Sequence, residues 1–276
     1  MYNESSYQVQ NIAGHLETEI NRLGAQVDLF WHKELKHYQE YGLKDGMKVV
    51  ELGSGPGFLT EKLLQVFPSL HVVGVEIDPL LVQVAERRLE RNFPGRYQIV
   101  TASVMDTGLP VDTYDFAITR LLIEHLTNPV AAAREVHRIL KPGAWGAFVD
   151  NDFEMHMNTF PSIPEIRELY EAYSRARSSE GGNPRIGREL PLLLRKAGFS
   201  SVDFEVICAH SAVVGDEVFF KAQGVGIPSK LVQDGFLSSK LLGKIAYEWR
   251  RIMKDDDHAI MRQLYMGVGQ KALVPG

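Results

Sequence analysis

Residues Val49–Gly57, V-V-E-L-G-S-G-P-G, form a short apolar run that ends in a glycine-rich turn, and this turn is the strongest indication of the fold. The run Met47–Leu52 is typical of a buried strand, and residues 57–67 follow with the spacing of an amphipathic helix. Glycines let a backbone turn tightly and let a ligand approach the main chain. In a parallel sheet, such a turn lies at the carboxyl edge of the strands, where ligands bind.

Predicted strands and helices alternate on either side of this turn. A helix over residues 15–41 precedes it, and β-α-β units of a parallel sheet follow it. The predicted strands of the first half are 47–52, 71–77, 97–101, 114–119 and 144–150, and its helices are 57–67, 79–92 and 129–140. The second half is predicted to contain helices at 163–178 and 187–197, a strand at 202–210 and a closing strand at 263–273.

These elements predict one α/β domain, residues 1–276, with a doubly wound, mainly parallel sheet. Residues 1–45 are expected to form a helical arm that acts as a lid. Residues 46–210 and 263–276 are expected to form the ligand-binding core, and 211–262 a helical insertion on the substrate side. An apolar pocket wall is expected from the large side chains of that insertion, Phe219, Phe220, Phe236, Leu241, Leu242, Tyr247 and Trp249.

The composition excludes several classes of protein. With 276 residues, 45% of them hydrophobic and 24% charged, the chain is neither disordered nor a coiled coil. A net charge of −5 and no basic stripe argue against a nucleic-acid partner. No apolar run is long enough for a membrane span, and the first twenty residues do not resemble a signal peptide. With Cys208 as the single cysteine, we expect a cytoplasmic protein. We expect it to be a monomer or a homodimer.

The spacing of the glycines limits the ligand. A dinucleotide-binding turn has the pattern G-x-G-x-x-G, whereas here the third glycine comes one residue early and Phe58 stands in its place. No Gly-Lys-Ser/Thr follows, which excludes a Walker loop. Glu76 ends the second predicted strand, where a carboxylate can accept hydrogen bonds from ribose hydroxyls. Nicotinamide-dependent enzymes use the same device, so Glu76 alone does not decide between nucleotides.

Four segments in order carry a resemblance to a known family. They are E-L-G-S-G-P-G, V-G-V-E-I-D-P, L-P-V-D-T-Y-D-F-A and L-K-P-G-A, which together span about 100 residues of the sequence. In this they resemble the class I S-adenosylmethionine-dependent methyltransferases of the small-molecule type. The resemblance implies a Rossmann-like, seven-stranded methyltransferase fold with an N-terminal helical arm and a helical insertion. It also implies S-adenosyl-L-methionine as cofactor and a small-molecule methyl acceptor.

The resemblance also assigns cofactor-binding residues. In this family the glycine turn contacts the methionyl part of the cofactor, the acid after the second strand holds the ribose, and the next residue packs on the adenine. Many members carry Gly-Asp-Ala after the third strand, whereas this chain has Ala102-Ser103-Val104. The cofactor-binding residues so implied are Gln26, Gly53, Ser54, Gly55, Glu76, Ile77, Ser103, Val104, Arg120 and Leu121.

Methyl transfer is an in-line displacement that releases a neutral thioether, so few dedicated catalytic residues are expected. The enzyme must align the nucleophile and, where needed, remove its proton. Polar side chains follow the fourth and fifth predicted strands, among them Glu124 and His156. We predict His125, Asp150 and Asp152 as the catalytic residues, because histidine and carboxylate groups can accept a proton near neutral pH.

A metal-dependent variant of the reaction is disfavoured. Asp150-Asn151 resembles the pair that catechol-type methyltransferases use to bind Mg²⁺. However, Thr119-Arg120 occupies the position of the additional acid, and the guanidinium would repel a cation. We therefore predict no metal.

The leading function is S-adenosylmethionine-dependent methyl transfer to an O, N or C nucleophile of a metabolite (EC 2.1.1.-). A non-catalytic S-adenosylmethionine-binding protein is the alternative, and a nicotinamide-dependent oxidoreductase is disfavoured by the glycine spacing.

Overall fold

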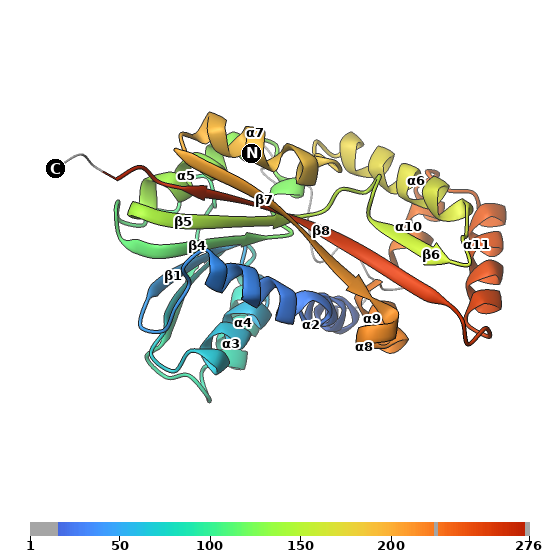
Figure 1. Ribbon diagram of the computed structural model, residues 1–276, viewed down its shortest axis with the longest axis horizontal. Coiled ribbons are helices and arrows are strands. Elements are labelled where there is room, and N and C mark those ends of the chain that lie inside the picture. The colour runs from blue at the N-terminus through green and yellow to red at the C-terminus, as the bar shows by residue number, and fades with distance from the viewer. Residues whose placement is uncertain (1–15, 224–225, 274–276) are drawn as a thin grey trace.

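The computed structural model describes residues 16–223 and 226–273, which fold around one twisted sheet of eight strands (Figure 1). The strands are β1 (Lys48–Leu52), β2 (His71–Glu76), β3 (Tyr97–Thr101), β4 (Tyr114–Arg120), β5 (Leu140–Asp150), β6 (Met157–Phe160), β7 (Ser201–His210) and β8 (Ala259–Gln270). Their order is β3-β2-β1-β4-β5-β8-β6, with β7 paired to β8. Strands β1 to β5 pair in parallel, and β8 is antiparallel to β5, β6 and β7. The predicted α/β fold with a mainly parallel sheet is confirmed.

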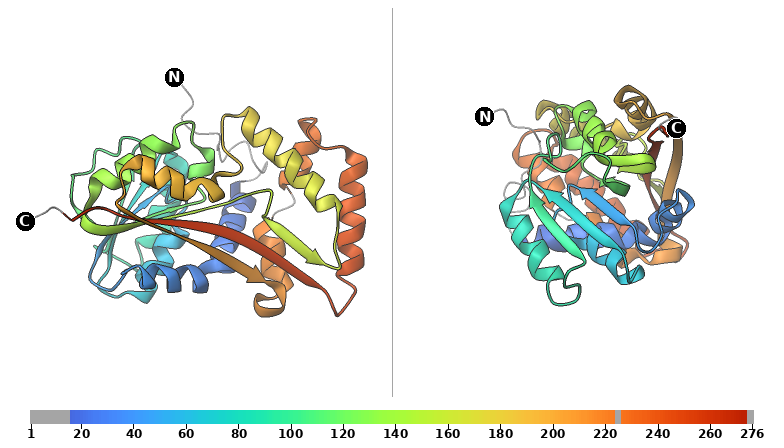
Figure 2. Two further views of the ribbon diagram at one scale, coloured as in Figure 1. Left: turned by 45° about the horizontal axis from the view of Figure 1, so that its top comes forward. Right: turned by 90° about the vertical axis from the view of Figure 1, so that its left-hand side faces the viewer.

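Helices cover both faces of this sheet (Figures 1 and 2). They are α2 (Leu16–Glu40), α3 (Phe58–Val66), α4 (Pro79–Leu89), α5 (Pro129–Ile139), α6 (Glu165–Ser179), α7 (Ile186–Ala197), α8 (Ser211–Val214), α9 (Asp216–Gln223), α10 (Gly226–Gln233) and α11 (Ser239–Ile252), with a short 3₁₀ helix, η1 (Ile123–His125). One apolar core packs α2 and α3 against the sheet through residues such as Phe30 and Leu63. A second core packs α5 and α7 on the opposite face, through Val136 and Leu190. Among the described residues, no helix combines the length and apolar character that a bilayer crossing requires.

Local sequence signals set the starts of several helices. Asp78 and Asn128 precede Pro79 and Pro129, and their side chains accept hydrogen bonds from the free amides of the first turn. Proline is favoured at that position because its missing N–H has no partner there in any helix. The helices that follow the second and fourth strands therefore begin where the sequence predicts.

The predicted lid needs correction. The second half of α2 is part of the main core, since Phe30, Glu34 and Tyr38 are at most 2% exposed. The Tyr38 hydroxyl donates to Glu34 at 3.2 Å, and Lys33 donates to the carbonyl of Cys208 in β7 at 2.6 Å. A segment packed in this way cannot open as a lid without exposing the core, so only the first half of α2 is placed to act as one. Residues 1–15 of the predicted arm lie outside the described residues.

Strand β8 corrects the boundary of the predicted insertion. It begins at Ala259 rather than 263, and its residues 265–270 pair with β5 while residues 259–262 pair with β6. Strand β6 was not predicted, because M-N-T-F is short and its side chains are only partly buried. It adds an eighth strand to the seven expected. Figure 1 shows β8 extending from beside β5 to the helical end formed by α6, α10 and α11, whereas β7 leads to α8 and α9.

Candidate active site

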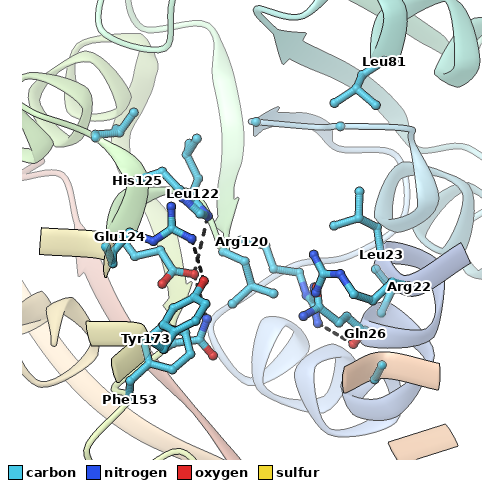
Figure 3. A pocket seen from close by; sticks show the side chains of 18 of the residues that line it. Arg22, Leu23, Gln26, Leu81, Arg120, Leu122, Glu124, His125, Phe153 and Tyr173 are labelled. Atoms are coloured by element: carbon cyan, nitrogen blue, oxygen red, sulfur yellow. Dashed lines mark hydrogen bonds and ion pairs between the residues drawn. The ribbon is translucent and has the colours of Figure 1, made fainter. Parts of the chain in front are cut away.

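A cavity of about 640 Å³ lies at the carboxyl edge of the parallel strands. Ligand pockets usually enclose about 300 to 1,000 Å³, so the cavity has the size of a small-molecule site. Figure 3 shows two walls facing each other. Arg22, Leu23 and Gln26 project from α2, while Glu124, His125 and Tyr173 project from the opposite side. Arg120, at the end of β4, lies between them.

The glycine turn forms the floor of the cavity next to β1. Gly53, Gly55 and Gly57 have φ angles of 73°, 52° and 79°, which side chains other than glycine rarely adopt. A Cβ atom at Gly53 would come within 2.9 Å of Leu122, whereas one at Gly55 would meet nothing within 4 Å. The turn thus leaves open space above Gly55, where a ligand can contact the backbone directly.

Glu76 ends β2 beside this turn and is buried. One carboxylate oxygen accepts a hydrogen bond from the backbone N–H of Gly55 at 2.8 Å, and the other accepts from Ile77 and Asp78 at 2.9 Å each. Burial raises the pKa of Glu76, while the three backbone donors oppose that shift. The carboxylate therefore holds three backbone amides and contributes to the stability of the turn as well as to the cavity wall.

The neighbouring wall suits a flat aromatic group. Ile77 is 51% exposed, which is unusual for a β-branched apolar residue between a strand and a helix. Leu81, Ser103 and Val104 line the same part of the cavity. The open space at Gly55, a carboxylate at the ribose position and an apolar wall fit the adenosyl and amino-acid parts of S-adenosylmethionine. The residues present therefore match this cofactor.

All ten predicted cofactor-binding residues line the cavity. The Arg120 guanidinium is already engaged: its Nε lies 2.9 Å and 3.0 Å from the two carboxylate oxygens of Glu34, and its Nη2 donates to the carbonyl of Gln26 at 2.7 Å. Arg120 therefore ties β4 to α2, and its surface toward the cavity is a positively charged wall. The individual roles of the ten residues stay predictions.

His125 lines the cavity, as expected of a catalytic candidate. Burial lowers its pKa well below 6.5, and the nearby guanidinium groups of Arg177 and Arg22 lower it further. The imidazole is therefore neutral at pH 7 and only weakly basic.

Asp150 and Asp152 are not among the cavity residues, and their predicted catalytic roles need correction. The Asp150 carboxylate accepts hydrogen bonds from the backbone N–H groups of Asn151 and Glu124 at 2.9 and 3.1 Å. Asp152 is fully buried in an ion pair with Arg188 of α7. Both carboxylates thus hold the loop after β5 in place and are not positioned to meet a substrate.

Glu124 meets the requirements of a proton acceptor better than either aspartate. It is 3% exposed and lines the cavity; its Oε1 accepts from the Asn151 amide at 2.8 Å, and its Oε2 has no hydrogen-bond partner among the described residues. Burial raises its pKa, so it takes up a proton more readily than an exposed glutamate. The sequence places Glu124 beside His125 after the fourth strand, but nothing there showed that one oxygen of the Glu124 carboxylate would be left without a partner.

The helical insertion lines the cavity through other residues than predicted. Its contribution comes from the end of α9 and from the segment at α10, namely Ala222, Gln223, Pro228, Lys230, Leu231 and Asp234. Phe219 is buried in the main core, and Phe236, Leu241 and Leu242 pack in a cluster between α6, α10 and α11. Phe220 and Tyr247 are exposed. The aromatic residues of the insertion therefore mostly hold its helices together.

Comparisons with known proteins identify a methyltransferase domain in this chain. A family model described as a methyltransferase domain matches residues 50–148, from β1 into β5. The chain is 24% identical over 216 residues to a malonyl-[acyl-carrier protein] O-methyltransferase of Paenibacillus sp., a match that covers 75% of this chain and 77% of that protein. It is 27% identical over 135 residues to the ubiquinone/menaquinone biosynthesis C-methyltransferase UbiE of Vibrio campbellii, which covers 48% and 49%. For several such relatives, the match thus spans about half of their length.

Solved structures share the fold. The phosphoethanolamine N-methyltransferase 2 of Haemonchus contortus superposes with a TM-score of 0.56 at 15% identity, covering 88% of this chain and 53% of that one. The [4+2]-cyclase SpnF superposes with a TM-score of 0.55 at 16% identity, covering 99% and 89%. A shared fold does not fix the chemistry, but the matched domain and the fitted site do define a class. Residues 50–148 form a methyltransferase domain, and the relatives and solved structures support a class I S-adenosylmethionine-dependent methyltransferase.

Proposed function

We propose that the protein transfers a methyl group from S-adenosylmethionine to an O, N or C nucleophile of a small-molecule metabolite. The observation that supports this proposal is the continuity of the cavity. The residues that fit the cofactor, around Gly55 and Glu76, and the polar groups around Glu124 line the same 640 Å³ space. An acceptor of metabolite size fits in that space beside the cofactor.

The protein's own residues supply position and proton transfer. When bound, the cofactor supplies an electrophilic methyl group on a sulfonium. Glu124 is placed to accept the proton of the acceptor nucleophile, and the Asn151 amide orients its carboxylate. Neutral His125 beside it can hydrogen-bond the acceptor. The first turns of α2 form the opposite wall (Figure 3) and help to exclude water.

The proposal is tested by incubating the purified protein with a metabolite extract and isotopically labelled S-adenosylmethionine. We expect a labelled small molecule and an equal amount of S-adenosylhomocysteine. Cofactor binding without any labelled product would instead support a non-catalytic S-adenosylmethionine-binding protein. Label in protein or nucleic acid would show a macromolecular acceptor.

Cys208 as the single cysteine supports a cytoplasmic place of action.

A further inference from the structure

Arg262 stands out among the arginines of the cavity wall. It lies on β8, is 3% exposed and lines the cavity, yet its Nε and Nη1 have no hydrogen-bond partner among the described residues. No carboxylate of the described chain lies within 4.0 Å of it. The other three arginines of the wall each contact one, in the pairs Arg22–Glu19, Arg120–Glu34 and Arg177–Glu180.

The protein holds this guanidinium in place without a carboxylate in contact with it. The Gln26 side-chain oxygen lies 3.2 Å from its Nη2, in the amide orientation that also satisfies Arg22. The ring of Phe30 lies 5.7 Å from its central carbon, within the range of a cation–π contact. Burial lowers the pKa of Arg262 to about 10, so the side chain is still charged at pH 7. A buried charge with no counterion is costly, and a ligand that brings the counterion removes that cost.

The position of Arg262 in the sheet separates it from the ribose-binding carboxylate. In the strand order, β8 is four strands from β2, which corresponds to about 19 Å at the usual spacing of strands. Arg262 also lies three residues beyond Tyr265, the partner of Asp150 at the end of β5, or about 10 Å past that strand. Arg262 thus lies at the end of the cavity away from Glu76.

The remaining lining groups orient the ligand. Glu124 also lines the cavity and interacts electrostatically with Arg262 without a direct ion pair, and its unpartnered Oε2 disfavours a second anion directly beside it. Phe153, Tyr170 and Tyr173 also line the cavity and give it an aromatic surface. An elongated ligand with one anionic end is therefore held in a defined direction, with its charge at β8.

We propose that Arg262 binds a carboxylate of the methyl acceptor. This carboxylate holds the acceptor in place, and a different group of the acceptor receives the methyl group. The inference rests on the proposed function and names the substrate class: a small apolar or aromatic carboxylic acid whose nucleophile lies at the other end, near Glu124. The guanidinium of Arg262 has no ion-pair partner among the described residues, and its single positive charge matches the single negative charge of a carboxylate.

A binding experiment tests this without knowledge of the natural acceptor. The protein is saturated with S-adenosylhomocysteine and titrated with 4-hydroxybenzoate and with 4-hydroxybenzamide, which have the same shape but differ in charge. We expect the wild type to bind the benzoate at least tenfold more tightly. Arg262→Gln should weaken benzoate binding about 10- to 100-fold and leave both benzamide binding and S-adenosylhomocysteine affinity unchanged. Arg262→Lys, which keeps the charge, should fall in between.

A matched control is Arg167→Gln, which removes an exposed arginine of α6 outside the cavity and should change no affinity. Equal binding of the two probes by the wild type, or no binding of the benzoate, would overturn the proposal. Loss of S-adenosylhomocysteine affinity in Arg262→Gln would assign the arginine to the cofactor instead. If the labelled product of the extract experiment is a methyl ester that base converts to methanol, the acceptor carboxylate is the nucleophile and the inference is wrong. Absence of any labelled product would contradict the proposed function and leave the binding result to stand alone.

Discussion

The carboxylate of Glu76 accepts a 2.8 Å hydrogen bond from the backbone N–H of Gly55, which ties the end of β2 to the turn that follows β1. Two further amides, those of Ile77 and Asp78, bond to the other oxygen. The same carboxylate that we assign to the ribose therefore also shapes the turn that the rest of the cofactor would contact. We therefore expect one side chain, Glu76, to contribute both to binding of the cofactor and to the stability of the turn after β1.

Replacing Glu76 with alanine should affect both properties. We expect about 10- to 100-fold weaker binding of S-adenosylhomocysteine and a loss of about 1–3 kcal/mol in the free energy of unfolding, because three amides lose a charged acceptor. Glu76→Gln keeps one acceptor oxygen and should be intermediate. Calorimetric titration and urea unfolding measure the two effects. Unchanged affinity in the alanine variant would place the nucleotide elsewhere.

The buried acids after β4 and β5 should separate into structural and functional groups. Asp152→Asn breaks the ion pair between buried Asp152 and partly exposed Arg188 and should lower the free energy of unfolding by about 1–3 kcal/mol, with little change in the turnover of folded protein. Glu124→Gln should retain stability but lower turnover at least about 100-fold, as expected for loss of a proton acceptor. Chemical unfolding and labelled-product formation give the two readouts. The reverse pattern would restore Asp152 as the catalytic candidate.

Glu51 should make stability depend on pH. Burial raises its pKa from 4.5 to about 8, although Thr60 donates a hydrogen bond to it. A group with a raised pKa in the folded state stabilises fully below its unfolded pKa and loses that contribution as the pH rises through its folded pKa. Because each pKa unit is worth about 1.4 kcal/mol, the loss has an upper limit of about 5 kcal/mol.

Glu51→Gln tests this effect, because the amide does not titrate. Its free energy of unfolding should equal that of the wild type near pH 4.5 and exceed it increasingly toward pH 8.5. His125 and His156, whose pKa values burial lowers, lose stability as the pH falls below 6.5, but they do so in both proteins and cancel in the difference. A difference that is constant across this range would show that Glu51 stays ionised in the folded state.

The parts of the fold that sequence patterns predict are those with strong local signals. Apolar runs and proline starts placed β1 to β4, α3 and α5 within one residue at each end, whereas β5 begins four residues earlier than predicted and α4 ends three residues earlier. Strand β6 was missed because pairing with β8, not its own four residues, makes it a strand. The direction of Asp150 and Asp152 was missed for a similar reason, since their partners lie on η1 and α7, far away in sequence.

Arg262 carried one signal that could have been used. It lies on the same face of β8 as Leu264 and Met266, which pack toward α2. Because side chains alternate between the two faces of a strand, an apolar residue is expected at this position. An arginine at such a position indicates a buried charge. The prediction that placed residue 262 in a helix concealed the alternation.

Activity should not require a divalent cation. The Asp150 carboxylate is occupied by two backbone amides, and the Arg120 guanidinium stands at the end of β4, where the additional acid of a metal site would be. Dialysis against a chelator should therefore leave the formation of labelled product unchanged. Complete loss of product that only Mg²⁺ restores would contradict this prediction.

Helix α2 should respond to the cofactor in its first half only. Arg22, Leu23 and Gln26 line the cavity, while Phe30 and Tyr38 are buried in the main core. A ligand that binds only the folded state slows amide exchange where its contacts suppress local opening. Adding S-adenosylhomocysteine should therefore slow exchange over residues 16–26, whereas residues 30–38 should be strongly protected with or without it.

Two substitutions on this helix separate the same two roles. Phe30→Ala removes a large side chain from the core and should lower the free energy of unfolding by about 3–5 kcal/mol. Leu23→Ala alters only the cavity wall, so it should cost much less stability and act mainly on the binding of S-adenosylhomocysteine. If residues 30–38 instead exchanged rapidly without ligand and Phe30→Ala left stability unchanged, all of α2 would behave as the lid that the sequence predicts. The burial of Phe30 and Tyr38, and the contact of Lys33 with β7, lead us to expect the opposite result.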